Sequence, residues 1–268
     1  MTNAPKVIVH EDRDALQAFL AGRFIGRMAQ VVGEFDEANV VLTGGSVGIG
    51  LLETINAHPD RDLAPWGQIH FWWGDERWVP RDHPDRNELQ ARQALLDHVP
   101  VDAAKVHAFP ASDDGLSLDE GAEHYAAELR AAAPPNLPLP AFDLVYLGVG
   151  PDGHVASLFP GLAGIRERDR TVVAVRNSPK PPPERLTLTI PVINSGARVA
   201  VFATGAEKAS AVGLALAGAS PDEVPLAAVR ARRRTGIHLD RDAAAQVPQR
   251  LLDPGEYWTS ADERPEAE

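Results

Sequence analysis

Strand-like and helix-like segments alternate along almost the whole chain, and this alternation constrains the fold more than any other feature. The strand-like segments are residues 6–9, 39–42, 68–73, 105–109, 142–149, 171–175, 185–190, 199–203 and 235–239. The helix-like segments are residues 13–32, the stretch from the 43–46 loop to about 56, 84–98, 118–133, 206–217 and a last short helix after 239. Because parallel strands need helical crossovers, the pattern predicts an α/β fold, with a mostly parallel sheet and helices on both faces.

The chain has a length that fits one domain. The proline-rich stretch 134–140 could join two domains, but the alternation continues unchanged across it, which favours a stiff surface connection. We therefore expect a single α/β domain over residues 1–258. The polar, acidic tail 259–268 is expected to be disordered.

Composition excludes several classes of function. The chain has 26 Lys+Arg against 38 Asp+Glu and a formal net charge of -12, whereas nonspecific nucleic-acid binding needs a basic face. It has no cysteine, hence no disulfide framework and no thiol nucleophile. No apolar run approaches the roughly 18 residues of a membrane helix, and we find no signal peptide. We expect a cytoplasmic protein that binds neither nucleic acid nor membranes.

The segment 142–161 carries the most informative motif. A strand-like run ends in a bend with two glycines, Gly150 and Gly153, and this bend carries Asp152 and His154. In an open α/β sheet, ligands bind at the carboxyl ends of the strands, and histidine is the side chain best suited to transfer a proton near neutral pH. Taken alone, the motif supports equally well a tight turn in which His154 is incidental.

A second loop, 43–48, follows a strand and precedes a helix. Gly44 and Gly45 allow a ligand to approach the backbone, and free amide groups at a helix start favour an anion such as phosphate. The alternative is a plain strand-to-helix turn with Ser46 as the N-cap. The spacing matches neither a Walker loop nor the dinucleotide fingerprint.

Three further segments concentrate positive charge. Arg77 follows the strand 68–73, and Lys180 and Arg185 lie in a loop, 178–185, that four prolines make stiff. Arginine can hold a phosphate or carboxylate in a bidentate fork, whereas the alternative is a set of solvated surface charges. Residues 230–234 are the densest basic cluster, and either a phosphate site or a solvated patch would fit them. The histidines lack metal-ligand spacing, so we predict no metal.

Taken in order, these motifs resemble the 6-phosphogluconolactonase family over nearly the whole chain, from about residue 7 to 258. The matching strings are Leu42-Thr43-Gly44-Gly45-Ser46, Gly74-Asp75-Glu76-Arg77 with Asp85-Arg86-Asn87, residues 147–161, and residues 178–187. The string Asp-Gly-His-x-Ala-Ser-Leu-Phe-Pro-Gly is the most specific. Two departures are Val47-Gly48, where the family often has Thr-Pro, and Arg86, where a serine is common.

The resemblance implies a Rossmann-like fold of the sugar-phosphate isomerase type. It also implies hydrolysis of 6-phospho-D-glucono-1,5-lactone to 6-phosphogluconate in the oxidative pentose phosphate pathway, with no cofactor. The implied catalytic residues are His154 as general base, Asp152 and Arg77. The implied substrate- and phosphate-binding residues are Gly44, Gly45, Ser46, Asn87, Lys180 and Arg185. We expect a monomer that acts on a small phosphosugar lactone.

Two other functions fit the same resemblance. Glucosamine-6-phosphate deaminases share the fold and an Asp-Gly-His string, but their string typically continues with an acidic residue that is missing from Ala156-Ser157-Leu158-Phe159-Pro160. A non-catalytic sugar-phosphate sensor would use the same pocket. Such sensors usually carry an added DNA-binding domain, for which this chain has neither room nor a basic segment.

Overall fold

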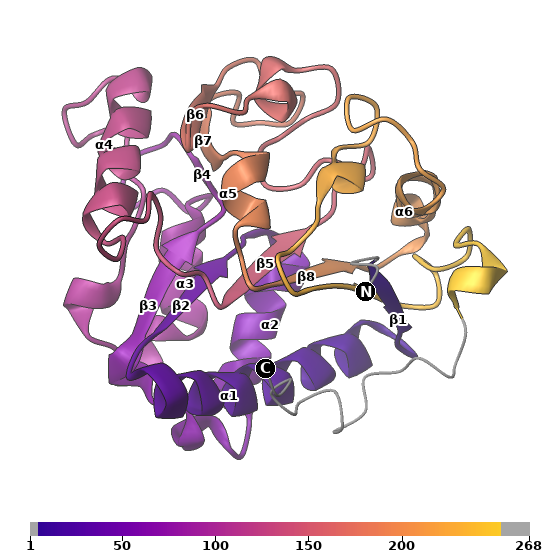
Figure 1. Cartoon of the computed structure of the whole chain (residues 1–268), viewed down its shortest axis with the longest axis horizontal. Helices are drawn as coiled ribbons and strands as arrows, with labels where there is room; N and C mark the ends of the chain where they lie inside the picture. The colour runs from indigo at the N-terminus through magenta and orange to yellow at the C-terminus, as the bar shows by residue number, and fades with distance from the viewer. Residues whose placement is uncertain (1–4, 253–268) are drawn as a thin grey trace.

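The computed structural model describes residues 5–252 and is built around a six-stranded, entirely parallel sheet (Figure 1). The strand order is β1-β9-β8-β5-β2-β3. The strands are β1 Lys6–Val9, β2 Ala38–Leu42, β3 Ile69–Trp73, β5 Leu144–Gly148, β8 Arg198–Ala203 and β9 Arg234–Leu239. Because all six run the same way, every loop that follows a strand emerges at one edge of the sheet.

Helices cover both faces of this sheet, as predicted. The helices are α1 Arg13–Phe35, α2 Gly45–Ala57, α3 Asn87–Ala94, α4 Leu118–Ala131, α5 Ile190–Asn194 and α6 Ala209–Leu216. The pair α1 and α2 lies on one side of the sheet in Figure 1, and α4, α5 and α6 lie on the other. Up to β3 the chain adds strands towards one edge of the sheet, and from β5 on it adds them towards the other edge. Because crossover connections between parallel strands are right-handed, this reversal moves the later helices to the opposite face.

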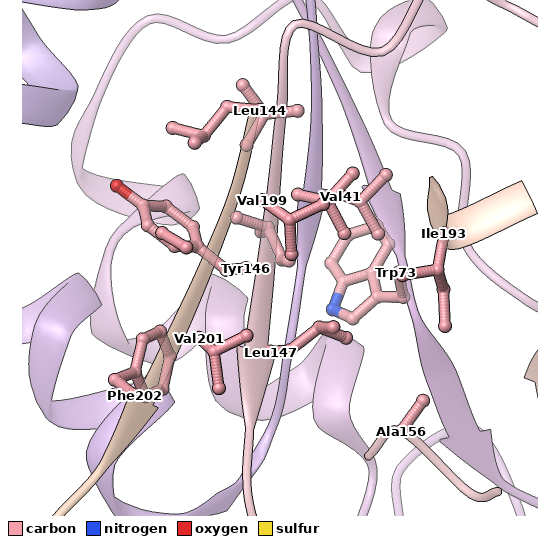
Figure 2. Packing of buried hydrophobic residues seen from close by; sticks show 14 of the residues in the cluster. Val41, Trp73, Leu144, Tyr146, Leu147, Ala156, Ile193, Val199, Val201 and Phe202 are labelled. Carbon is pink, nitrogen blue, oxygen red and sulfur yellow. The ribbon is translucent and has the colours of Figure 1, made fainter. Parts of the chain in front are cut away.

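The central strands are apolar on both sides, which is why they end up between two helical layers. Residues of β5 alternate in direction: Tyr146 points to one face, while Leu147 points to the other, towards Trp73 and Ile193 (Figure 2). The helices add their own signals, since Asp12 caps α1 through a 2.8 Å bond from Ala15 N and a capping box opens α4.

Three predicted segments differ from the structure in where they pair. Residues 171–175 and 185–190 form β6 Val172–Val175 and β7 Arg185–Leu188, which leave the main sheet and pair antiparallel with β4 Asp75–Arg77. The strand predicted at 105–109 is wrong. Only Val106 forms a bridge there, to Phe71, and the neighbouring carbonyls of His107 and Phe109 accept hydrogen bonds from side chains instead.

Two predicted helices are shorter than the sequence pattern indicates. In place of 84–98, α3 spans only Asn87–Ala94, because residues 80–86 form turns and Leu96–His98 is a 3-10 helix. In place of 206–217, α6 follows a 3-10 turn. The 3-10 helices are Arg61–Leu63, Trp66–Gln68, Leu96–His98, Ala103–Lys105, Ala163–Arg166, Ala206–Lys208, Pro225–Ala228 and Gln249–Leu251, and the last of these is the predicted final short helix.

The proline-rich stretch 134–140 is a largely exposed connection between α4 and β5. The buried hydrophobic residues of the described range form one contiguous cluster. A single domain over 1–258 stays a prediction, and the tail 259–268 lies outside the described residues. Among residues 5–252, none of the helices is both long and apolar enough to cross a bilayer.

Candidate active site

A cavity of about 270 Å³ lies at the carboxyl edge of the sheet. The loops after β2, β3, β5 and β8 all contribute to its wall. The sheet changes its direction of growth between β2 and β5, and such a switch point is where open α/β sheets bind ligands. Eight of the nine site residues predicted from the sequence line the cavity. The ninth, Asp152, does not line it but is hydrogen-bonded to His154, which does.

Asp152 and His154 form a hydrogen-bonded pair in the bend after β5. His154 Nδ1 and Asp152 Oδ1 lie 2.5 Å apart. A 2.9 Å hydrogen bond from Gly150 N to the His154 carbonyl closes the bend. Within the described residues, Nε2 of His154 makes no hydrogen bond, and the cavity wall includes this residue. The pair thus fixes one ring nitrogen and leaves the other for a reacting group.

Electrostatics keep Asp152 ionised. Burial raises the pKa of its carboxyl, but the hydrogen bond and charge of His154 outweigh burial and lower that pKa to about 2. The aspartate is therefore an anion at neutral pH and a strong acceptor for the Nδ1–H of the imidazole.

Gly150 provides the room that this pair needs. A Cβ at this position would lie 1.9 Å from His154 Nδ1 and 2.5 Å from Asp152 Oδ1. Any side chain would therefore displace the imidazole or the carboxylate, so glycine is required here for close approach.

The amino end of α2 faces the same cavity. Its N-cap is Gly44, which has no side chain to occupy the helix amides, and Gly45 has a φ of 81°. The alternative in which Ser46 is the N-cap is wrong, because Ser46 lies inside the first turn. Thirteen residues of helix thus direct their positive dipole end and free amides at the cavity, an arrangement that suits an anion.

Asn87 lies beside this helix end and is held there by Glu76. Both carboxylate oxygens of Glu76 accept hydrogen bonds from backbone amides at the start of α3. Asn87 N donates to Oε1 at 2.7 Å, and Glu88 N donates to Oε2 at 2.9 Å. Burial raises the pKa of Glu76 to about 7, against the lowering effect of Arg86 and of these amides. Asn87 Nδ2 donates to the Asp75 carbonyl at 2.8 Å, which leaves its buried Oδ1 without a partner in the described chain.

The predicted cations differ in how much of their hydrogen-bonding capacity is available. Arg77 donates from Nη1 to the Asp85 carbonyl at 2.7 Å, and its buried Nε has no partner among the described residues. Arg185 is buried, and its Nε and Nη2 donate to three carbonyls of its own loop at 3.1 to 3.2 Å. Its Nη1 makes none of these bonds and lies 4.0 Å from the Asp75 carboxylate. Arg185 therefore braces the proline-rich loop as well as lining the cavity.

Lys180 and Lys208 bring further positive charge to the cavity. Burial lowers the pKa of Lys180, whereas the negative charge of Asp152 raises it. The positive charges of Lys208 and Arg185 also lower this pKa, so the three cations lie close enough to interact. Our sequence analysis missed Lys208, which follows β8 at the carboxyl edge. Its position five residues after the predicted strand 199–203 was a signal that could have revealed it.

The arginine cluster 230–234 does not contribute to this cavity. It precedes or begins β9, at the amino edge of the sheet, whereas the cavity lies at the carboxyl edge. Arg86 is also structural. It is fully buried and donates to the carbonyls of Phe109 and Pro110. The described residues contain no group of three or more His, Asp and Glu side chains that could hold a metal ion.

Comparison with known proteins gives a consistent result. The family model for glucosamine-6-phosphate isomerases/6-phosphogluconolactonase matches residues 11–237. A 6-phosphogluconolactonase of Streptomyces coelicolor is 45% identical over 258 residues, which cover 95% of this chain and 99% of the relative. One of Mycobacterium tuberculosis is 44% identical, with 90% and 97% covered.

The chain belongs to the glucosamine-6-phosphate isomerase/6-phosphogluconolactonase family. Solved structures agree: a 6-phosphogluconolactonase from Thermotoga maritima superposes with a TM-score of 0.77 at 29% identity, covering 88% of this chain and 100% of the other. The enzyme from Trypanosoma brucei gives the same TM-score and identity, with 91% and 99% covered. A monomeric glucosamine-6-phosphate deaminase, 20% identical with a TM-score of 0.75, shares the fold. The Rossmann-like architecture of the family is thereby confirmed.

One local feature separates this member of the family from the deaminase pattern. After His154 the chain continues through Ser157, which is buried and donates from Oγ to Asp75 Oδ2 at 2.6 Å. Ser157 N in turn donates to Thr187 Oγ1 at 3.2 Å. The segment 155–160 contains no acidic residue, so it lacks the carboxylate expected of a deaminase and instead positions Asp75 at the cavity.

Proposed function

We propose that the protein is a 6-phosphogluconolactonase, which hydrolyses 6-phospho-D-glucono-1,5-lactone to 6-phosphogluconate in the oxidative pentose phosphate pathway. The observation that carries this proposal is the Asp152–His154 pair, placed in a cationic cavity at the switch point of the sheet. The relatives that match nearly end to end carry the same activity in their names.

His154 acts as the general base. Its neutral Nε2 removes a proton from a water molecule, whose oxygen bonds to C1 of the lactone while the carbonyl oxygen becomes an oxyanion. The C1–O5 bond then breaks, and the proton held on His154 passes to O5, so the imidazole returns to its starting state. Asp152 holds Nδ1–H and stabilises the imidazolium between these two steps.

Arg77 and the Gly44–Ser46 amides stabilise the negative charge that develops on the substrate. Arg77 Nε is a buried donor without a partner in the described chain, and preorganised donors of this kind lower the barrier to acyl transfer. Asn87 Oδ1, also unpartnered there, can accept a hydrogen bond from a sugar hydroxyl.

The phosphate is held by Lys180 and Arg185, with Lys208 added from its position in the cavity wall. A dianion needs local positive charge in a chain whose formal net charge is -12. Because most donors of Arg185 are engaged by its own loop, the two lysines take the larger share of the contact. The acidity of the chain argues against nucleic-acid partners, and the proposal also includes a monomer that acts in the cytoplasm.

The deciding experiment supplies freshly generated 6-phosphogluconolactone to the purified protein and follows its loss against the spontaneous rate. We expect acceleration that persists after treatment with a chelator, and no release of ammonia from glucosamine 6-phosphate. Loss of lactone at the spontaneous rate would refute the proposed function, and a chelator-sensitive rate would refute the metal-free mechanism.

A further inference from the structure

A buried carboxylate adjoins the candidate active site without lining its cavity. Glu76 of β4 is 1% exposed. Besides the two bonds from the start of α3, it accepts a third hydrogen bond, from Arg77 N to Oε1 at 2.8 Å. Oε1 therefore accepts from Arg77 N and Asn87 N, and Oε2 accepts from Glu88 N. One carboxylate thus ties the backbone of β4 to the amino end of α3.

Two of these three amides belong to residues that line the cavity. Arg77 and Asn87 each present a buried atom to it, Nε and Oδ1, that has no hydrogen-bond partner among residues 5–252. Asn87 Oδ1 also occupies the place where a Cβ of residue 44 would stand, so it fits tightly against Gly44 at the amino end of α2. Even a small displacement of the Asn87 backbone would therefore change the contact that this atom offers to a ligand.

The hydrogen bonds around Glu76 fit its ionised form. An ionised carboxylate only accepts hydrogen bonds, and all three partners are N–H donors. Hydrogen bonds to a charged acceptor are roughly twice as strong as those between neutral groups, so protonation of Glu76 weakens its hold on all three amides. The ionisation of Glu76 therefore controls how firmly Arg77 and Asn87 are held.

Opposing effects bring the ionisation of Glu76 into the neutral pH range. Burial raises the pKa of its carboxyl to about 7 against the charge of Arg86 and the three amides, and Arg86 has the largest of these lowering effects. Arg86 is fully buried and donates to the carbonyls of Phe109 and Pro110, which fix its position. The other titratable or charged groups on the surrounding elements are Asp75 and Arg77 of β4, Asp85 before α3, Glu88 of α3, Arg185 of β7 and Tyr125 of α4.

We propose that Glu76 is a positioning residue for the reaction: its carboxylate, kept ionised by the charge of Arg86, holds Arg77 and Asn87 where they contact the substrate. This role rests on the proposed function, in which Arg77 stabilises developing negative charge and Asn87 accepts from a sugar hydroxyl. Glu76 touches no substrate, because it lies outside the cavity wall. When Glu76 takes up a proton, both residues lose part of a common anchor, and the stabilisation of the transition state falls.

The first test needs no substrate. The amide proton shifts of Arg77, Asn87 and Glu88 in the full chain are followed by NMR between about pH 5 and pH 9. We expect the three signals to follow one titration with a midpoint at about pH 7, and Glu76→Gln to abolish it. Arg86→Gln should move the midpoint upward by about one pH unit or more, whereas Arg86→Lys, which keeps the charge, should move it less.

Arg81→Gln is the matched control for the loss of one positive charge. Arg81 lies in the same turn-rich segment before α3, but it is exposed and pairs with Asp114 at 2.6 Å. The midpoint in this variant should therefore stay where it is in the wild type.

The second test compares kcat/KM for freshly generated 6-phosphogluconolactone in the wild type and Glu76→Gln over the same pH range. The wild type should exceed the variant about tenfold or more above about pH 8, and by much less below about pH 6, where its own Glu76 is neutral. Protonation of His154 is common to both proteins and cancels in the ratio. A merely structural loss would lower kcat/KM by the same factor at every pH.

The two tests separate this positioning role from the proposed function. An inactive wild type whose three amides titrate with Glu76 would refute the proposed activity yet support the positioning of Arg77 and Asn87 by Glu76. Amide signals that do not titrate together in the wild type, a midpoint that Arg86→Gln leaves unchanged, or an activity ratio that is constant with pH would overturn the positioning role. If Glu76→Gln does not fold, the midpoints of the wild type and of the two Arg86 variants decide the outcome.

Discussion

Replacement of Gly150 by alanine should disable the protein without touching a polar group of the site. The new Cβ would lie 1.9 Å from His154 Nδ1, whereas ordinary contacts begin at 3.4 Å, so the imidazole must move by about 1.5 Å or the bend must open. Gly150 does not have a positive φ, so alanine introduces no backbone strain of its own. Misplacement of a reacting group by about 1 Å costs on the order of 10²-fold in rate, or about 2.7 kcal/mol of transition-state stabilisation.

The assay is kcat for freshly generated 6-phosphogluconolactone, corrected for the spontaneous reaction, together with thermal unfolding of each variant. Gly33→Ala is the matched control: Gly33 lies in α1, nothing lies within 4 Å of its added Cβ, and the change should leave kcat unaltered and stabilise the helix by about 0.5–1 kcal/mol. A folded Gly150→Ala protein with wild-type kcat would show that the position of the imidazole does not limit the reaction, and would refute this reasoning.

Three further predictions follow from the same site. His154→Ala should lower kcat roughly 10²-fold or more with little change in KM, measured by the same lactone assay; near-full kcat would place the base elsewhere. Lys180→Ala and Lys208→Ala should each raise KM for the phosphorylated lactone by about tenfold or more yet hardly affect unphosphorylated gluconolactone, and equal losses on both substrates would contradict a phosphate contact. Asp152, whose pKa falls from 3.8 to about 2 on folding, should stabilise the protein above pH 4 and lose this contribution as pH falls towards 2. After allowance for solvent screening of this partly exposed carboxyl the effect is about 1 kcal/mol, so unfolding of wild type and Asp152→Asn, compared at pH 5 and pH 2, should differ more at pH 5.

Local patterns in the sequence were sufficient to predict the parallel sheet and its two helical layers. Runs such as 142–149 are apolar on both sides, and only a strand between two covering layers buries both. The same patterns placed the 43–48 and 150–154 loops after strands, and parallel strands bring such loops to one edge. The short-range geometry of Asp152 and His154 was predictable for the same reason, since two residues of one bend are close whatever the rest of the fold does.

What the sequence could not decide depends on partners that are distant along the chain. The 185–188 strand is apolar enough for the main sheet, but it pairs with Asp75–Arg77, more than a hundred residues away. The start of α3 is set by the Glu76 carboxylate from outside the helix, so helical periodicity alone placed it too early. Lys208 joins Lys180 only because separate crossovers pack against one sheet. Propensity and periodicity describe neighbours in sequence, whereas these contacts are decided by how the layers pack together.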